Sequence, residues 1–67
     1  MRLDVFLTNG KFLVVTEDTG KVLDNIVHGK DSFVEIVDKN QLKHFVNVDH
    51  IVEVKVILHP IGWGYSE

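Results

Sequence analysis

The sequence predicts a small α+β domain: an N-terminal β-hairpin, one helix at about residues 18–28, and a three-stranded antiparallel meander, all forming one curled sheet. Three observations predict this class. An Asn-Gly pair separates two runs of β-forming residues, one segment has apolar residues at helical spacing, and the rest returns to short β-rich runs joined by polar turns. With 67 residues the chain is expected to fold as one domain, at 1–59, followed by an aromatic C-terminal arm at 60–67.

The hairpin is predicted by the stretch RLDVFLTNGKFLVVT. Alternate residues from Leu3 to Leu7 are apolar, so one face of the first strand is apolar. Asn9-Gly10 supplies the positive φ angles that a two-residue hairpin turn requires. The stretch VFLTNGKFLVV also resembles the first motif of Sm-like RNA-binding barrels, and the resemblance covers this hairpin alone. It implies the alternative fold, an all-β small SH3/Sm-like barrel in which 18–28 is strand and turn.

The segment EDTGKVLDNIVHGK favours a helix over a strand. Its apolar residues form one stripe at helical spacing, at Val22, Leu23, Ile26 and Val27. Asp18 or Thr19 is placed to cap the N-terminus, and Gly29 follows the last turn, where a helix commonly stops.

Three strands are predicted from SFVEIV, LKHFVNV and IVEVKVIL. The short polar connections between them predict an antiparallel meander. In the last strand, alternation places Val52, Val54 and Val56 on the inward face, and Ile51 and Ile57 on the outward face.

More apolar residues are present than one sheet and one helix can cover. The outward-facing set is Phe6, Phe33, Val37, Phe45 and Ile57. Because a contiguous exposed apolar patch usually marks an interaction site, we expect either closure of the sheet into a barrel or a second copy of the chain over this face. These residues are the predicted interface.

The C-terminal segment PIGWGYS extends this prediction. Ile61, Trp63 and Tyr65 alternate with glycines, so an extended chain projects all three side chains to one side. Large aromatic groups are costly to leave in water, which favours an arm docked on its own sheet or on a neighbouring copy. We therefore include these three residues in the predicted interface.

The sequence offers little for catalysis. Cysteine is absent, and neither a nucleophile elbow nor a phosphate-binding glycine loop occurs. The histidines at 28, 44, 50 and 59 match no metal-ligand spacing, and a metal site at His44, Asp49 and His50 is the weakest of the hypotheses. We expect no enzymatic activity, no cofactor, and no catalytic or metal-binding residues.

The expected function is that of a small non-enzymatic protein-binding or regulatory module that self-associates as a homo-oligomer. The alternative is a small barrel that binds single-stranded nucleic acid by stacking bases on exposed phenylalanines. The net charge of −3 and the scattered basic residues disfavour a nucleic-acid partner. No stretch is long and apolar enough for a signal peptide or a membrane span, so we expect a cytoplasmic protein without a membrane partner.

Overall fold

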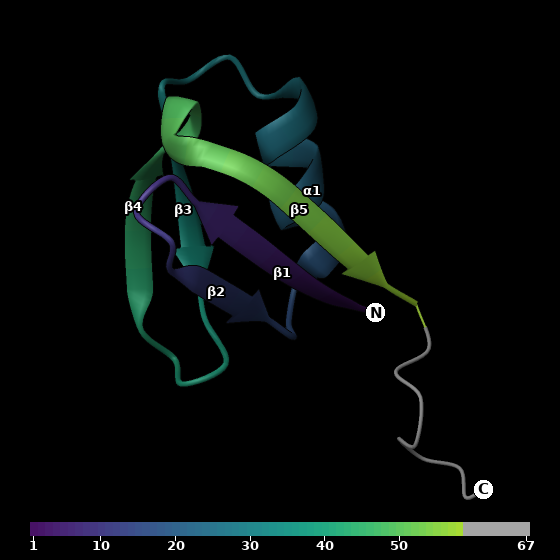
Figure 1. The fold of residues 1–67 in the computed structure, drawn as a ribbon. Helices are drawn as coiled ribbons and strands as arrows, with labels where there is room; N and C mark the ends of the chain where they lie inside the picture. The colour runs from purple at the N-terminus through teal and green to yellow at the C-terminus, as the bar shows by residue number, and fades with distance from the viewer. Residues whose placement is uncertain (59–67) are drawn as a thin grey trace, which may run out of the picture.

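A computed structural model of the protein describes residues 1–58 (Figure 1). Over this range the elements are β1 (Arg2–Leu7), β2 (Phe12–Val15), α1 (Thr19–His28), β3 (Phe33–Val37), β4 (Lys43–Asn47), the 3-10 turn η1 (Val48–His50) and β5 (Ile51–Ile57). The predicted α+β class, the N-terminal hairpin and the helix are confirmed. The arm predicted at 60–67 lies outside the described residues.

The strands form two antiparallel sheets, one with the order β2-β1-β5 and one made of β3 and β4. β5 pairs with β1, which places Val54 opposite Val5 and Val56 opposite Leu3. The predicted meander is therefore wrong in its last pairing, since β5 does not continue from β4 into a single sheet. Neither sheet of the described chain closes on itself, so the barrel alternative is wrong as well.

The turn η1 explains why the chain leaves the β3–β4 sheet. The Asn47 side chain accepts a hydrogen bond from the Asp49 N–H at 2.9 Å and so caps this turn. The Thr8 N–H then donates to the His50 carbonyl at 2.9 Å, which attaches the end of η1 to the loop after β1. The chain is thereby directed along β1 instead of back along β4.

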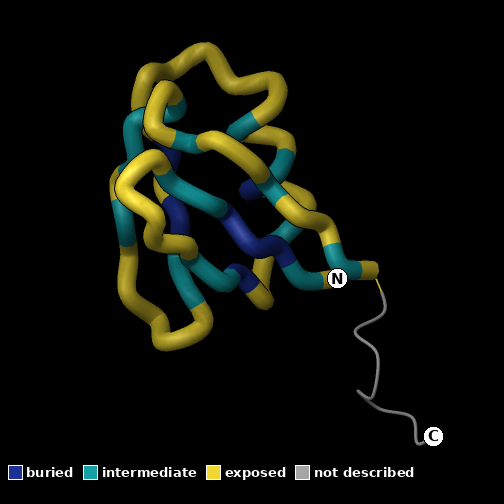
Figure 2. The backbone as a smooth tube through the Cα atoms, viewed as in Figure 1, coloured by how far each residue is buried: buried dark blue, intermediate teal, exposed yellow. Residues whose placement is uncertain are grey.

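The core lies between the inner faces of the two sheets and one side of α1 (Figure 2). Its fully or almost fully buried members are Leu3, Val5, Val15, Val22, Val34 and Ile36. Leu23 and Ile26 pack against this cluster, as the predicted stripe requires, whereas Val27 is exposed. The helix therefore contributes a narrower apolar side than its sequence predicts.

A β-bulge in β5 changes the predicted faces of that strand. Phe6 is opposite Glu53, but Leu7 is opposite Ile51, so Val52 is an extra residue between two regular pairs. Ile51 consequently packs against the core, and Val52 is 63% exposed. Alternation alone had placed these two residues the other way round.

The turn of the β1–β2 hairpin also differs in detail from the prediction. Gly10 has a φ of 86°, whereas Asn9 has no positive φ, so the turn is not the predicted two-residue type. The Gly10 N–H donates to the Leu7 carbonyl at 3.0 Å, and the Leu7 N–H donates to the Lys11 carbonyl at 2.9 Å. The loop therefore has three residues, with glycine at the left-handed position that such loops favour.

The ends of α1 were located correctly, but they are built differently from the prediction. Asp18 occupies the N-cap position with a φ of 52°, and its side chain makes no capping hydrogen bond. Gly29 ends the helix in an extended conformation, where a Cβ atom would lie 2.2 Å from the Asn25 carbonyl oxygen. Glycine is required there by this close approach and not by a positive φ.

Candidate functional site

The predicted interface residues are divided between the two sheets. Phe33, Val37 and Phe45 lie on the outer face of the β3–β4 sheet, because Val34 and Ile36 between them point into the core. Phe6 and Ile57 lie on the outer face of the β2-β1-β5 sheet. Ile61, Trp63 and Tyr65 lie outside the described residues. The predicted residues therefore do not form one contiguous patch within residues 1–58.

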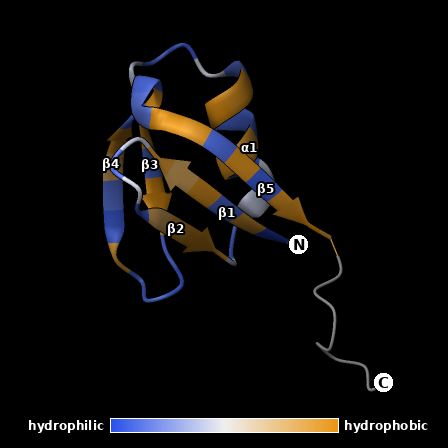
Figure 3. Cartoon of the chain, viewed as in Figure 1, coloured by the Kyte–Doolittle hydropathy of each residue, from blue (hydrophilic) through white to orange (hydrophobic). Residues whose placement is uncertain are grey.

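Among residues 1–58, the most exposed aromatic side chains belong to the β3–β4 sheet. Phe33 is paired with Asn47 and Phe45 with Glu35, which makes the two phenylalanines diagonal neighbours on one face. Their exposed fractions are 57% and 67%. We call this feature the Phe33–Phe45 surface. Figure 3 colours β3 and β4 by hydropathy: β3 has one hydrophilic residue, Glu35, and β4 has an apolar centre at Phe45 and Val46.

An open groove runs from the Phe33–Phe45 surface toward the loop after β1. It has a volume of about 520 Å³, and its lining is completed by Leu7, Thr8, Asn9, Val46, Asn47 and His50. His50 contributes a ring nitrogen 3.3 Å from the Thr8 hydroxyl oxygen. The groove thus combines two phenylalanine rings with a few polar groups, which is the usual composition of a binding site.

A second, smaller groove of about 250 Å³ adjoins the same rings on the side of the helix end. Asn25, Gly29, Asp31 and Glu35 line it together with the two phenylalanines. Carboxylates are therefore present on this side of the Phe33–Phe45 surface. The Glu35 carboxylate also lies 3.6 Å from the Lys43 ammonium, in an exposed ion pair.

Asp38 organises the turn that joins β3 to β4 and so fixes the register of the Phe33–Phe45 surface. Its carboxylate accepts hydrogen bonds from the Asn40 N–H at 2.8 Å and the Leu42 N–H at 3.1 Å. Its other oxygen lies 2.8 Å from Nε2 of His44. The hydrogen bond from His44 lowers the pKa of Asp38, with smaller contributions from the two backbone donors. Gln41 completes the turn with a φ of 68°.

The outer face of the β2-β1-β5 sheet presents a different environment for its aromatic residues. The ring of Phe6 stacks on that of Phe12 with centroids 5.2 Å apart, and the Lys55 ammonium lies 5.2 Å from the Phe6 centroid. Beside them Asp4 is only 8% exposed and accepts two hydrogen bonds from the Arg2 guanidinium, at 2.9 and 3.3 Å. On this face Phe6 and Asp4 are covered by neighbours within the chain, whereas Phe12 is 50% exposed.

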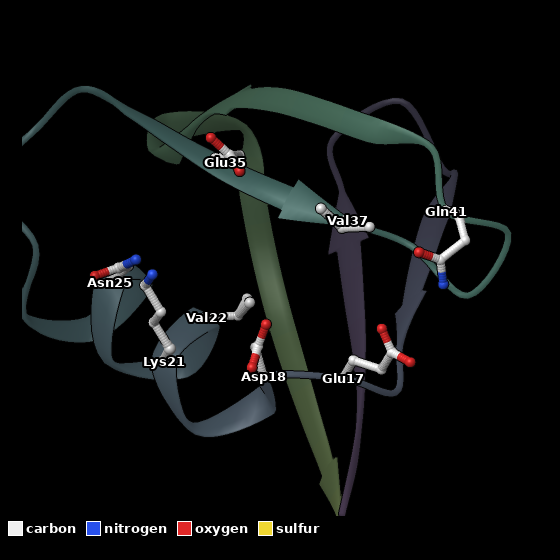
Figure 4. A pocket seen from close by; sticks show the side chains of 8 residues that line it. All are labelled: Glu17, Asp18, Lys21, Val22, Asn25, Glu35, Val37 and Gln41. Atoms are coloured by element: carbon white, nitrogen blue, oxygen red, sulfur yellow. The ribbon is translucent and has the colours of Figure 1, made fainter.

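The cavity between the start of α1, β3 and the β3–β4 turn is lined mostly by polar and charged residues (Figure 4). It measures about 360 Å³ and is lined by Glu17, Asp18, Lys21, Val22, Asn25, Glu35, Val37 and Gln41. The side chains drawn in Figure 4 come from these separate elements and include no Ser, Thr, Cys or His. Among residues 1–58, no three His, Asp or Glu side chains are grouped closely enough to hold a metal ion.

Two features of the structure, one contact and one buried residue, were not predicted from the sequence. The Asp38–His44 pair links a turn residue with a strand residue six positions later, and the only local signal is the aspartate that begins the turn DKNQ. The burial of Asp4 has no sequence signal, because an Arg-x-Asp pair on a strand is normally read as a solvent-exposed face.

Comparison with known protein families, with curated proteins and with solved structures finds no match to this chain. The described part of the chain contains no helix that is both long enough and apolar enough to cross a membrane. The function must therefore be argued from the geometry.

Proposed function

We propose that the protein is a small non-enzymatic protein-binding module, and that the Phe33–Phe45 surface with its adjoining groove binds an apolar group of the partner protein. The single observation that carries this proposal is the exposure of two phenylalanine rings side by side on one rigid hairpin. Two rings in this arrangement offer a concentrated apolar contact area, and aromatic anchors of this kind dominate the energetics of protein interfaces.

The rigidity of the hairpin supports this proposal. Val34 and Ile36 anchor β3 in the core, and Asp38 holds the turn through three hydrogen bonds. A surface that is held in place by its scaffold loses little conformational entropy when a partner binds, so more of the contact energy appears as affinity.

The chemistry around the rings favours a protein partner over a nucleic acid. Glu35 is directly opposite Phe45, and Asp31 lines the smaller groove beside Phe33. Carboxylates at these positions repel a phosphate backbone, whereas single-strand binding sites surround their stacking rings with basic groups. The cavity of Figure 4 has no Ser, Thr or Cys hydroxyl or thiol and no His to activate one, which supports a non-catalytic role.

Site-specific photo-crosslinking tests the proposal. A photoreactive phenylalanine analogue is placed at position 45 and, as a matched control, at position 12, which is also an exposed phenylalanine but lies on the other sheet. After irradiation in the cells that produce the protein, crosslinked products are identified by mass spectrometry. We expect one protein to be crosslinked from position 45 and not from position 12, and to be lost when Phe33→Asp is added.

Other products would contradict the proposal. Crosslinks to nucleic acid from position 45 would support the single-strand-binding alternative instead. The same set of products from positions 45 and 12, or none from position 45, would mean that the Phe33–Phe45 surface is not a specific binding site.

A further inference from the structure

The two outer edges of the β2-β1-β5 sheet differ in how they are covered. At the β2 edge, the Lys39 N–H donates to the Val14 carbonyl at 2.8 Å. Along β5, β1 is the only strand partner within residues 1–58, so alternate backbone N–H and C=O groups point away from the sheet. An edge strand of seven residues with open backbone groups is a template for pairing with another strand.

The sequence of this edge strand is nearly palindromic. β5 reads Ile-Val-Glu-Val-Lys-Val-Ile, and it is symmetrical about Val54 except that Glu53 on one side corresponds to Lys55 on the other. In Figure 3 β5 is an apolar strand interrupted by hydrophilic bands. A sequence of this kind is complementary to itself when two copies run antiparallel.

We propose that the chain forms a homodimer in which β5 pairs antiparallel with β5 of a second copy, across a two-fold axis at Val54. The two sheets then join as β2-β1-β5-β5-β1-β2. In this register Glu53 is directly opposite Lys55 of the second copy, and the symmetry produces this ion pair twice. Glu53, Val54 and Lys55, which carry both ion pairs, lie in the regular part of the β1–β5 ladder on each copy.

The charges select this register over its neighbours. When the two-fold axis is perpendicular to the sheet, it passes through one residue of β5, and the side chains of paired residues lie on the same face. The registers near the middle of the strand are therefore those centred on Glu53, Val54 or Lys55. Centring on Glu53 places two carboxylates opposite each other, and centring on Lys55 places two ammonium groups opposite each other. Like charges directly opposite are destabilising, so only the Val54-centred register pairs opposite charges.

The exposed valines of β5 gain contacts in the same register. Val56 is 42% exposed although it lies on the core-facing side of the sheet, opposite Leu3. In this register its partner position on the second copy is Val52, the residue of the bulge, which is 63% exposed. Pairing therefore places two exposed apolar positions of the single chain at the dimer contact.

Lys55 has a second role in this arrangement. A lysine on an edge strand normally discourages pairing with other strands, because its charge is placed against an apolar neighbour. Opposite Glu53 of the second copy, the same charge is favourable. Lys55 therefore stabilises pairing with this strand and disfavours pairing with others. Within its own chain Lys55 faces Asp4, whose carboxylate is bound to Arg2, and the Phe6 ring.

Within residues 1–58 the strands of the other sheet, β3 and β4, also have edges without a strand partner, but neither is self-complementary. β3 reads Phe-Val-Glu-Ile-Val and β4 reads Lys-His-Phe-Val-Asn, so neither pairs opposite charges when two copies run antiparallel. The dimer contact is thus assigned to β5, on the sheet that does not carry the Phe33–Phe45 surface. It is independent of the proposed function, and each proposal can fail without the other.

Charge reversal with rescue tests the dimer. Sedimentation equilibrium over a wide concentration range is measured for the full chain, for Lys55→Glu, for Glu53→Lys and for the double exchange. Each single reversal replaces two ion pairs by two like-charge pairs, so we expect dimerisation to weaken about tenfold or more. The double exchange restores opposite charges in the same register and is expected to restore the dimer. On the helix, Lys21→Glu changes the net charge as Lys55→Glu does, and Asp24→Lys changes it as Glu53→Lys does, so each reversal has a matched control.

The register has its own test, because the chain lacks cysteine. Glu53→Cys and Lys55→Cys proteins are oxidised separately and as a mixture. In the Val54-centred register position 53 faces position 55 of the second copy, so the mixture is expected to form the disulfide-linked dimer efficiently and each protein alone poorly. These exposed positions also preserve the core if the charge-reversed proteins do not fold.

Four results would overturn the proposal. The first is a monomeric mass at every concentration. The second is a dimer that each reversal weakens no more than the helix control of the same charge change. The third is a dimer weakened by the reversals but not restored by the double exchange. The fourth is disulfide formation that is no faster in the mixture than in the separate proteins.

Discussion

The outer faces of the two sheets differ in how they pack their phenylalanines, although Phe12 on the first face is itself half exposed. On the β2-β1-β5 sheet, Phe6 stacks on Phe12 and lies beneath the Lys55 ammonium. On the β3–β4 sheet, Phe33 and Phe45 remain more than half exposed. Strand alternation assigns an outward direction to phenylalanines of both sheets. It cannot distinguish a ring that packs on neighbours within the chain from one that remains in water. The number of strands explains the difference: the three-stranded sheet gives its central strand two flanking strands whose side chains cover Phe6.

This comparison identifies which aromatic residues stabilise the fold and which are available to a partner. A phenylalanine that packs on neighbours within the chain contributes to folding stability, and its removal should unfold the protein more easily. One that projects into water contributes little to stability, and its removal should affect only binding. The following predictions test this distinction.

The largest effect is expected from the core below the Phe33–Phe45 surface. Ile36 is completely buried on the inner face of β3. Ile36→Ala leaves a cavity and should lower the free energy of unfolding by about 2–5 kcal/mol, a large fraction of the stability of so small a domain. Chemical denaturation followed by circular dichroism measures this. A loss of less than 1 kcal/mol would mean that β3 does not anchor the hairpin in the core.

A smaller loss is expected on the outer face of the other sheet. Phe6→Ala removes the stacking with Phe12 and the contact with Lys55, and should cost about 1–2 kcal/mol of unfolding free energy. Phe12→Ala in the Phe6→Ala background should then cost less than it does alone, because the two rings share one contact. Strict additivity in this double-mutant cycle would contradict the stacked arrangement.

Acid should weaken the turn of the β3–β4 hairpin. The hydrogen bond from His44 lowers the pKa of Asp38 in the folded protein, so the stabilisation is present above the unfolded pKa of about 3.8. It is lost as the pH falls through the folded pKa. Denaturation midpoints should therefore fall with pH below about pH 4, and less steeply for Asp38→Asn. An equally steep fall in this variant would show that Asp38 makes no such contribution.

The smallest effect on stability is expected at Phe45. Because its ring is largely in water, Phe45→Ser should change the free energy of unfolding by no more than about 0.5 kcal/mol. The same denaturation measurement applies, with Phe6→Ala as the comparison. A loss as large as that of Phe6→Ala would mean that Phe45 is a structural residue, and the Phe33–Phe45 surface would then lose its support.

Local features of the fold were predictable because their signals lie within a few residues. Asn9-Gly10 marks a hairpin, and the spacing of Val22, Leu23 and Ile26 marks a helix. The type of the β1–β2 turn was not predictable, because Asn-Gly is compatible with loops of two or three residues. Only the hydrogen bonds of Leu7 decide between these two lengths.

The pairing of β5 was not predictable from its own residues. An apolar strand fits beside any strand that offers an open edge, and nothing in IVEVKVI distinguishes β4 from β1 as its neighbour. The decision depends on contacts between distant segments, such as that of Thr8 with His50. The bulge at Val52 follows from the same pairing, and so the faces of Ile51 and Val52 were misassigned. The outward direction of Phe33 and Phe45 was predictable, since the pattern of β3 and β4 is regular.

The most direct test of the central claim, that β5 is the edge at which two copies pair, is amide hydrogen exchange measured residue by residue as a function of protein concentration. We predict that β5 amides exchanging rapidly in the dilute protein become protected as the concentration rises. The β4 amides should show no such change, and Lys55→Glu should remove the effect. Exchange of the β5 amides that is equally rapid at every concentration would contradict the claim.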